Sequence, residues 1–395
     1  MKNKHIPELR FPEFKNDGEW EEIPLGSICN ITNGKSNAQD HVENAKYPMF
    51  DRSEVIKASN SFIFDCEAVI IPGEGMRFIP KYYKGKFNLH QRAYALKDFN
   101  CNGLFVYFSM LHKSKQLSIK AVQSTVLSLR LPILQSFSID IPRSITEQQK
   151  IAFCLSSLDE VITAHSQKLE ALKVHKKGLM QNLFPQEGET FPKWRFKKFA
   201  KDGEWVEKKL DEVAVFLKGK GISKADIVEN GSLPCIRYGE LYTYYNETIS
   251  IIKSYTNSNA DDLVISEAND VIIPASGETQ IDIATASCVL EKGIALGGDL
   301  NIIRSKINGV FLSYYLNNAK KNEIAQMAQG IAVVHLYPNQ LRNLIIQFPK
   351  PKEQQKIASS LTSLETLITT QAEKIEQLKL HKKGLMQGLF PKTND

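Results

Sequence analysis

The chain has 395 residues, of which 42% are hydrophobic and 24% are charged, and its formal net charge is +6. This length suits two domains of ordinary size, and the composition excludes a chain that is disordered throughout. No apolar run approaches the ~18 residues that cross a bilayer, and the opening MKNKHIPELRF lacks the apolar core of a signal peptide, so we expect a cytoplasmic protein.

The chain begins with a leading segment that occurs twice. Residues 7–22, PELRFPEFKNDGEWEE, align with residues 192–207, PKWRFKKFAKDGEWVE, at nine of 16 positions. Each copy contains a tryptophan near its end, Trp20 in the first and Trp205 in the second. Self-similarity at a fixed offset indicates a tandem duplication.

A body of mixed periodicity follows each leading segment. In the first, AVIIP (68–72) and SFSIDIP (136–142) are typical of strands, and LFVYFSMLHKSK (104–115) is typical of a helix. In the second, DLVISEANDVIIPASG (262–277) and LIIQFP (344–349) predict strands, and residues 310–328 predict a helix. We therefore expect both bodies to be α+β. Apart from a few local features such as AVIIPGEG (68–75) against DVIIPASG (270–277), their sequences share little.

Each body is followed by a stretch with the heptad spacing of a coiled coil. Residues 147–185 and 353–391 are identical at 25 of 39 positions, from EQQKIA to HKKGLMQ and LFP. Thr146 and Gln149 predict a capping box at the first start, and Pro185 and Pro391 end the helices. The predicted helix-pairing residues are Ile151, Leu155, Leu158, Ile162, His165, Leu169 and Leu172 in the first copy, and Ile357, Leu361, Leu364, Ile368, Gln371, Ile375 and Leu378 in the second.

A single apolar stripe is usually explained by a helix packed on its own domain. Two observations favour pairing of these helices instead. They have equal length, and their polar interruptions fall at equivalent places, His165 with Gln371 and Lys176 with Lys382. Polar residues in such a seam penalise wrong registers. An antiparallel pair would hold the two bodies at opposite ends.

The sequence contains no motif for catalysis. NGKS (33–36) resembles the end of a phosphate-binding loop, but Cys29 stands where the first glycine of that motif is needed. GEGMRF (73–78) does not match the dinucleotide-binding fingerprint, because Phe78 replaces its last glycine. The six cysteines are scattered, and the eight histidines show no metal-binding spacing. We expect no catalytic centre, metal site or bound cofactor in this chain.

Both bodies contain basic and hydrogen-bonding residues mixed with aromatics. For any one of them a solvated surface is an equally good explanation, but as sets they suit nucleic acid, since Lys and Arg contact phosphates and Arg and Gln pair with base edges. The predicted DNA-binding residues are Arg77, Lys81, Tyr82, Tyr83, Lys84, Lys86, Gln91 and Arg92 in the first body, and Lys218, Lys220, Lys224, Arg237, Tyr238, Tyr242, Thr279 and Gln280 in the second.

The motifs EQQKIA…L..LD..I, HKKGLMQ.LFP and IP..G resemble the repeated conserved regions of the DNA-specificity (S) subunits of type I restriction-modification systems. The resemblance covers essentially the whole chain. It implies two target recognition domains (residues 1–145 and 186–351) and two spacer helices (146–185 and 352–391). The expected fold class is α+β, with two globular domains separated by two long antiparallel coiled-coil helices and an internal duplication of pseudo-twofold symmetry.

The resemblance also implies partners. Two methyltransferase (M) subunits would dock on the chain and bring S-adenosylmethionine for adenine-N6 methylation, and restriction (R) subunits would bring ATP and Mg. The chain would bind double-stranded DNA and no membrane. Because the bodies differ, we expect a bipartite, asymmetric site. We hypothesise that the leading segments, which are alike in both halves, pack on the helices or contact the methyltransferase subunits.

An alternative function is a coiled-coil scaffold that joins protein partners without recognising DNA. Bodies that diverge and are rich in Arg, Lys, Gln and Tyr favour DNA recognition. An autonomous nuclease or methyltransferase would require a motif for a metal or cofactor, which the sequence lacks. The DNA sequence that is read, the residue that contacts each base, the spacer length and the restriction activity do not follow from the sequence.

Overall fold

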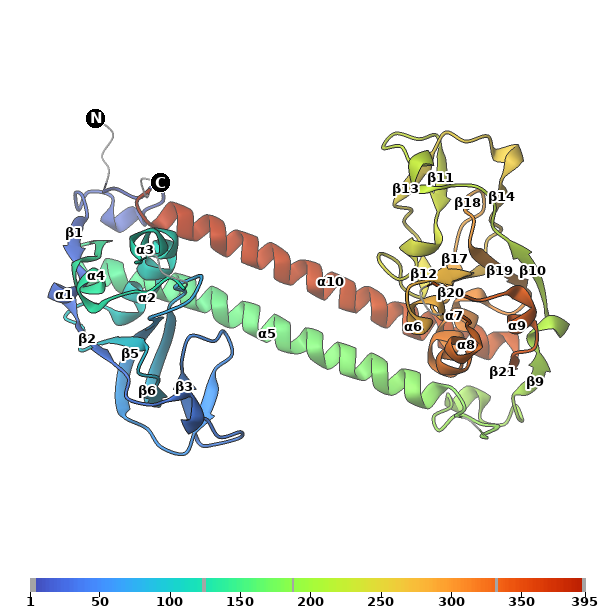
Figure 1. Ribbon diagram of the computed structural model, residues 1–395, viewed down its shortest axis with the longest axis horizontal. Helices are drawn as coiled ribbons and strands as arrows, with labels where there is room; N and C mark the ends of the chain where they lie inside the picture. The colour runs from blue at the N-terminus through green and yellow to red at the C-terminus, as the bar shows by residue number, and fades with distance from the viewer. Residues whose placement is uncertain (1–4, 123–125, 187, 331–332, 393–395) are drawn as a thin grey trace. The chain divides into compact units, whose positions relative to one another are not determined.

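The computed structural model describes residues 5–122, 126–186, 188–330 and 333–392. The chain divides into two compact units (Figure 1). Unit 1 comprises residues 1–167 and 372–395, and unit 2 comprises residues 168–371. The two long helices, α5 (Ile145–Leu183) and α10 (Pro351–Leu389), each contribute one half to either unit.

Unit 1 is built on a six-stranded sheet of order β2-β7-β5-β6-β3-β4 and a separate pair, β1-β8. All pairs are antiparallel except β3 with β6. The strands are β1 (Glu21–Pro24), β2 (Asn30–Asn33), β3 (Tyr47–Phe50), β4 (Lys57–Ser59), β5 (Phe64–Pro72), β6 (Lys81–Leu89), β7 (Ala93–Lys97) and β8 (Ser138–Ile141).

The long strand β5 is buried on both faces, which explains why AVIIP is continuously apolar. Val69 and Ile71 face one core, together with the helices of the unit, and Ala68 and Ile70 face a second, smaller core. The short helices are η1 (Pro12–Phe14), α1 (Leu25–Ile28), η2 (Ala38–Asp40), α2 (Gly103–His112), α3 (Ser114–Lys120) and α4 (Leu131–Ser136).

Unit 2 has a five-stranded sheet of order β10-β19-β15-β17-β12, a four-stranded sheet of order β13-β11-β18-β14, and the pairs β16-β20 and β21-β9. Its strands are β9 (Val206–Lys209), β10 (Ala214–Lys218), β11 (Leu233–Ile236), β12 (Thr248–Ile249), β13 (Ser254–Thr256), β14 (Val264–Ile265), β15 (Asp270–Pro274), β16 (Ser276–Gly277), β17 (Ser287–Val289), β18 (Ala295–Leu296), β19 (Leu300–Ser305), β20 (Val334–His335) and β21 (Ile345–Phe348).

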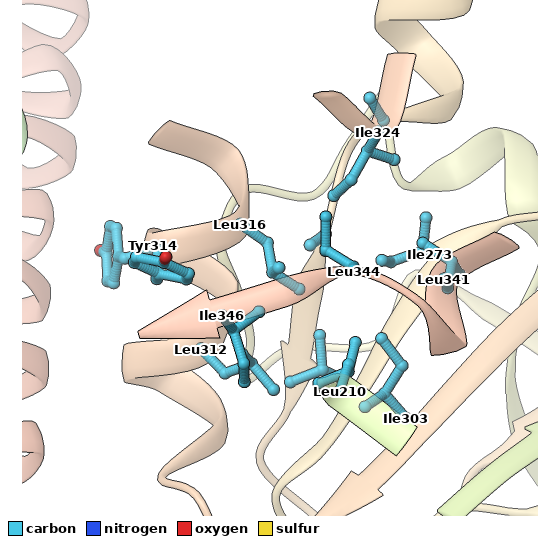
Figure 2. Close-up of a cluster of buried hydrophobic side chains, with 14 of the residues drawn as sticks. Leu210, Ile273, Ile303, Leu312, Tyr314, Leu316, Ile324, Leu341, Leu344 and Ile346 are labelled. Carbon is cyan, nitrogen blue, oxygen red and sulfur yellow. The ribbon is translucent and has the colours of Figure 1, made fainter. Parts of the chain in front are cut away.

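The main core of unit 2 lies between the sheets and helix α7. Figure 2 shows Leu312 and Leu316 of α7 beside Ile346 of β21, with Leu210 and Ile303 below them. The helices of this unit are η3 (Lys197–Phe199), η4 (Leu210–Glu212), η5 (Lys224–Asp226), η6 (Tyr238–Glu240), η7 (Ala260–Asp262), α6 (Gln280–Ile283), α7 (Gly309–Asn318), α8 (Lys321–Met327) and α9 (Pro338–Arg342).

The two bodies share one framework despite their different sequences. The strand pair β3-β6 is parallel, with Phe50 opposite Leu89, and its counterpart β11-β18 is parallel with Ile236 opposite Leu296. The divergence between the two bodies is therefore one of sequence and not of backbone. The sequence comparison missed the framework because it is specified by apolar positions, which tolerate exchange among Phe, Leu and Ile.

In each unit, halves of α5 and α10 pack side by side in opposite directions. In unit 1 the end of α10, with Leu389, joins the core that contains Ile151 near the start of α5. In unit 2 the end of α5, with Leu183, joins the core that contains Ile357 near the start of α10. The mixed fold class and the antiparallel helices are confirmed.

Helix α5 begins two residues earlier than the predicted capping box implies, at Ile145. Ser144, and not Thr146, precedes the helix, and its Oγ accepts a 3.4 Å hydrogen bond from the amide of Glu147. Thr146 instead exchanges a 2.6 Å hydrogen bond with the Ser144 hydroxyl. At the other helix, Pro351 occupies the first position, where its missing amide costs no hydrogen bond.

Candidate nucleic-acid interface

Three loops meet at the end of the sheet in unit 1. They follow β2 (residues 34–37), β3 (51–53) and β6 (90–92). The amide of Gln91 donates to the carbonyl of Ser36 at 2.9 Å, and the amide of His90 donates to the carbonyl of Phe50 at 2.9 Å. We call this surface the three-loop platform of unit 1.

Unit 2 has an equivalent three-loop platform, made of residues 219–223, 237–239 and 297–299. The amide of Gly298 donates to the carbonyl of Gly221 at 2.6 Å, and the amide of Gly297 donates to the carbonyl of Ile236 at 2.9 Å. These bonds match those of unit 1 position by position. The loops, together with Lys224 and Asp226, line a pocket of about 570 Å³, to which Arg237 also contributes.

The first loop of each platform contains a glycine that no other residue can replace without displacing the backbone. A Cβ on Gly34 would lie 2.0 Å from the carbonyl oxygen of Leu89, and a Cβ on Gly219 would lie 2.0 Å from that of Gly297. The next residue is an exposed lysine in both loops, Lys35 and Lys220. The Gly-Lys pair is thus an identical feature of two platforms whose other side chains differ.

Five of the eight DNA-binding residues predicted for unit 1 are exposed: Arg77, Lys84, Lys86, Gln91 and Arg92. Two of them lie on the platform. Gln91 donates from its amide Nε2 to Asn37 Oδ1 at 2.9 Å, and Arg92 pairs with Glu74 at 2.9 Å. Arg77 lies in the loop after β5, and Lys84 and Lys86 lie on β6, so the structure does not gather all five at one place.

The other three residues predicted for unit 1 have structural contacts. Tyr82 donates its hydroxyl hydrogen to Glu67 at 2.7 Å, and burial raises the pKa of this phenol. Tyr83 packs its ring against Phe50 with the centroids 5.5 Å apart. Lys81 donates to the carbonyl of Ser53 and thereby supports the second platform loop. Burial lowers the pKa of Lys81.

The lysines predicted for unit 2 are exposed and lie on or next to the platform. Lys218 ends β10, Lys220 belongs to the first loop, and Lys224 lines the pocket. Arg237 is half-buried because its guanidinium pairs with the buried carboxylate of Glu240 at 3.1 Å.

The remaining predictions for unit 2 fall into two groups. Tyr238 lies on the platform and lines the pocket, and Tyr242, whose pKa is raised by burial, is half-buried behind it. Thr279 and Gln280 are exposed at the start of α6. The Thr279 hydroxyl accepts a 3.1 Å hydrogen bond from the amide of Asp282, so it caps this helix.

The residues predicted to pair the helices follow the less exposed stripe of each helix. Ile151, Leu155, Ile357, Leu361, Leu364, Gln371 and Ile375 are buried, and Leu158, Ile162, His165, Leu169, Leu172, Ile368 and Leu378 are intermediate. Mostly more exposed residues separate them, so burial along both helices follows a 4,3 spacing.

The lysine that interrupts each helix seam has an acidic partner on the other helix. In unit 1, Lys382 contacts Asp159; in unit 2, Lys176 contacts Glu365 at 2.7 Å. Lys176 also contacts Glu247 of the body at 3.1 Å. Burial alone would lower the pKa of Lys176, but the two carboxylates outweigh it and raise the pKa.

The sequence profile of the "Type I restriction modification DNA specificity domain" matches twice, at residues 17–174 and 202–380. The chain belongs to this DNA-specificity family. This confirms the expected identification as a specificity subunit. Because the family is that of the non-catalytic recognition subunit, it also confirms that the chain is no enzyme by itself.

Three curated members of the family are similar to this chain. The EcoDI specificity subunit of Escherichia coli is 29% identical over 45% of this chain and 40% of its own length. The MjaVIII specificity subunit of Methanocaldococcus jannaschii is 25% identical over 98% of this chain and 94% of its own length, and a putative MjaX subunit of the same organism is 25% identical over 78% and 68%. The chain thus spans less than half of the first relative and nearly all of the second.

Two solved structures have the same fold. The S subunit of the type I restriction-modification system from M. genitalium matches 98% of this chain and 100% of its own, with a TM-score of 0.71 and 16% identity. A structure concerning complex assembly and conformational transition of the type I system covers 94% of this chain and 97% of its own, with a TM-score of 0.52 and 14% identity. At these identities the likeness concerns the fold.

The leading segments of this specificity subunit pack on the helices, as hypothesised. Arg10 makes two hydrogen bonds to Glu147 of α5, at 2.7 and 2.8 Å, and one to the carbonyl of Gly18. In unit 2, Arg195 makes the same bonds to Glu353 of α10, both at 2.8 Å. Both glutamates are almost fully buried.

The duplicated tryptophans pack on the opposite helix ends. Trp20 contacts Phe390, which follows α10, with the ring centroids 6.1 Å apart. Trp205 contacts Phe184, which follows α5, with the centroids 6.4 Å apart. Each unit therefore joins the start of one long helix to the end of the other through its own leading segment.

Sequence reasoning missed three platform residues of this subunit: Lys35, Arg52 and Asp299. Lys35 had a recognisable signal, because the Gly-Lys pair follows the duplicated tryptophan by 14 residues in both halves. The other two had none. Arg52 and Asp299 acquire their place only through the parallel register of β3-β6 and β11-β18, which the sequence does not display.

Within the described ranges, no helix combines the length and the apolar character that crossing a membrane requires. Over the same residues, no group of three or more His, Cys, Asp and Glu is arranged to hold a metal ion.

Burial raises the pKa of the thiols of Cys29 and Cys288 to about 12, so these two cysteines are poor nucleophiles and metal ligands at neutral pH.

Proposed function

We propose that this chain reads a bipartite, asymmetric DNA site, with one recognition domain for each half, and positions two adenine methyltransferase subunits and the restriction subunits on it. The recognition domains would be residues 1–145 and 186–351, and the spacer helices residues 146–185 and 352–391. S-adenosylmethionine would be bound by the methyltransferase partner, and ATP and Mg by the restriction partner.

One observation carries this proposal. The specificity-domain profile occurs twice in the chain, and the two copies have the same framework with different exposed side chains. Two equivalent readers with identical surfaces would read a palindrome, whereas different surfaces require two different half-sites. The parts that remain alike, the long helices and the leading segments, are suited to binding two copies of one partner.

A scaffold that joins only proteins is the alternative. It does not explain why basic and amide side chains differ between two bodies of the same framework, since equal partners would select equal surfaces. Its distinguishing property is that DNA would have no effect on the complex.

The test is to map methylated adenines in the DNA of cells that express the methyltransferase subunit alone or together with this chain. We expect methylation at one bipartite, non-palindromic motif only when both are present. Methylation that does not depend on this chain, or a palindromic motif, would contradict the proposal. A scaffold would form the complex and leave the motif undefined.

A further inference from the structure

The two three-loop platforms share their backbone and differ in their side chains. The positions after Phe50 and Ile236 carry Asp51-Arg52 in unit 1 and Arg237-Tyr238 in unit 2. The positions after Leu89 and Leu296 carry His90-Gln91-Arg92 in unit 1 and Gly297-Gly298-Asp299 in unit 2. None of these five positions has the same residue in both units.

The chemistry of the differing residues is that of base recognition. Gln and Arg make paired hydrogen bonds to adenine and guanine edges, respectively, and Asp accepts a hydrogen bond from cytosine. Arg52, Gln91, Arg92 and Asp299 are all exposed. Gln91 is held in place by Asn37 and Arg92 by Glu74, which limits the side-chain freedom that binding would remove.

Among the residues of the two platforms, the Gly-Lys pair of the first loop is identical in both. Gly34 and Gly219 allow this loop to approach the third loop or the strand before it, which fixes the position of the following lysine. A side chain kept in two readers with different sequences must serve what the two half-sites have in common. In duplex DNA this is the phosphate backbone.

We propose that the three-loop platform is the base-reading surface of each recognition domain. Lys35 and Lys220 contact phosphates in the same way in both half-sites. Gln91, Arg92 and Arg52 read one half-site, and Arg237, Tyr238 and Asp299 read the other. This assignment rests on the proposed function and divides its residues into two roles.

The roles predict different phenotypes for single substitutions in the full chain, purified with its methyltransferase subunits. Gln91→Ala lowers the discrimination against wrong bases at one position of one half-site by about 5- to 150-fold, and leaves the recognition of the other half-site unchanged. Asp299→Ala does the same in the opposite half. Lys35→Ala weakens binding to every sequence alike and lowers the slope of log affinity against log salt by about one, without changing the motif.

Lys115→Ala is the matched control, because Lys115 is an exposed lysine of α3 outside the platform. It removes the same charge and should leave the salt slope unchanged. Affinities are measured on duplexes with the wild-type motif and with single-base changes, and motifs are mapped from methylated adenines. All four side chains are exposed, and an unaltered circular-dichroism spectrum verifies that each variant is folded.

The outcomes separate this inference from the proposed function. If the wild-type complex reads no bipartite motif, the proposed function fails. If it reads one, and Gln91→Ala and Asp299→Ala leave the motif intact, the platform is not the reading surface. Equal salt slopes for the Lys35→Ala and Lys115→Ala variants would overturn the phosphate contact.

Discussion

The ammonium of Lys382 lies 2.5 and 2.6 Å from the two carboxylate oxygens of Asp159. Lys382 is in the last third of α10 and Asp159 in the first half of α5, so this ion pair joins the two antiparallel helices in unit 1. In unit 2 the pair of Lys176 with Glu365 stands at the equivalent position. Each copy of HKKGLMQ thus contains a lysine whose acidic partner lies on the other helix.

Exchanging the charges of the first pair tests whether it determines the register. Asp159→Lys and Lys382→Asp each place like charges opposite one another, and we expect each to destabilise unit 1 by about 1–2 kcal/mol, since Asp159 is partly exposed. The double variant restores an ion pair and should recover most of the loss. Hydrogen exchange of peptides from residues 145–167, followed by mass spectrometry, reports unit 1 separately. Strictly additive effects of the two substitutions would show that the pair has no such role.

The buried ion pairs of the leading segments, which involve Arg10 and Arg195, should contribute more to the free energy of unfolding than the pair of Lys382 with Asp159. Arg10→Ala leaves the carboxylate of Glu147 buried without its partner, which costs about 3–5 kcal/mol, and Arg195→Ala does the same to Glu353. Arg10→Lys should lose less stability than Arg10→Ala but remain less stable than the wild type, because lysine cannot make both hydrogen bonds of the planar guanidinium.

Lys173→Ala is the control for the arginine variants, because its pair with Glu170 is fully on the surface of α5. It should change the free energy of unfolding by only a few tenths of a kcal/mol. Chemical denaturation of the variants gives the comparison. An effect of Arg10→Ala as small as that of Lys173→Ala would show that the leading segment is not fastened to the helix by this pair.

The helices and the duplication were predictable because they depend on local and periodic signals. The heptad spacing identifies the buried stripe directly, and the structure gives a reason for the first two kept positions of EQQKIA. Glu147 and Glu353 bind the arginines, and the side chains of Gln148 and Gln354 accept from the amides of Asn102 and Asn308 at 2.9 Å. Repetition of residues at equal spacing is a signal that one sequence contains in full.

The residues of the proposed reading surface were predictable only in part. Gln91, Arg92 and Lys220 were recognised by residue type, but the same criterion selected Tyr82 and Lys81, whose side chains support the body. Residue type does not reveal which side of a strand faces a core. The common framework was also hidden, because it depends on pairing between strands far apart in the chain, such as β3 with β6.

The glycines of the first platform loops give a prediction with a control inside the chain. Gly34→Ala or Gly219→Ala places a Cβ 2.0 Å from a backbone oxygen, so the loops must move apart, and we expect a loss of about 1–3 kcal/mol together with weaker DNA binding. Gly178 of α5 has open space around its Cβ position. Gly178→Ala should therefore stabilise the helix by up to about 1 kcal/mol. Thermal unfolding of the platform variants and of Gly178→Ala gives the comparison. Equal changes in stability would contradict the close approach of the first platform loop to the neighbouring backbone.

Asp51 holds the second platform loop of unit 1 and gives that loop a pH dependence. Burial would raise the pKa of this carboxyl, but the ion pair with Lys57 at 2.6 Å and the amide of Ser53 at 2.7 Å outweigh it and lower the pKa below its ordinary value of 3.8. A carboxyl with a lowered pKa stabilises the folded state above its ordinary pKa, and this contribution is lost as the pH falls through the lower, folded value.

We therefore expect Asp51→Asn to destabilise unit 1 by about 1–3 kcal/mol at pH 7. The difference from the wild type should be constant between pH 5 and 7 and shrink below about pH 4. Free energies of unfolding measured in urea at each pH check this. A difference that does not change with pH would mean that the charge of Asp51 is not what stabilises the loop.

The length of the spacer helices should determine the length of the unread DNA between the half-sites. Seven residues are one heptad, so inserting a heptad at equivalent places, after Leu169 in α5 and after Ile375 in α10, keeps the apolar seam in register. The insertion adds about 10 Å of helix, which corresponds to about three base pairs at 3.4 Å each. We expect the methylated motif to keep both half-sites and to gain about three unread base pairs.

A four-residue insertion at the same places is the control, because it rotates the apolar seam of the helices and should abolish methylation. If the heptad variant methylates the original motif, the helices do not set the spacing, and the recognition domains must be positioned by the partner subunits instead.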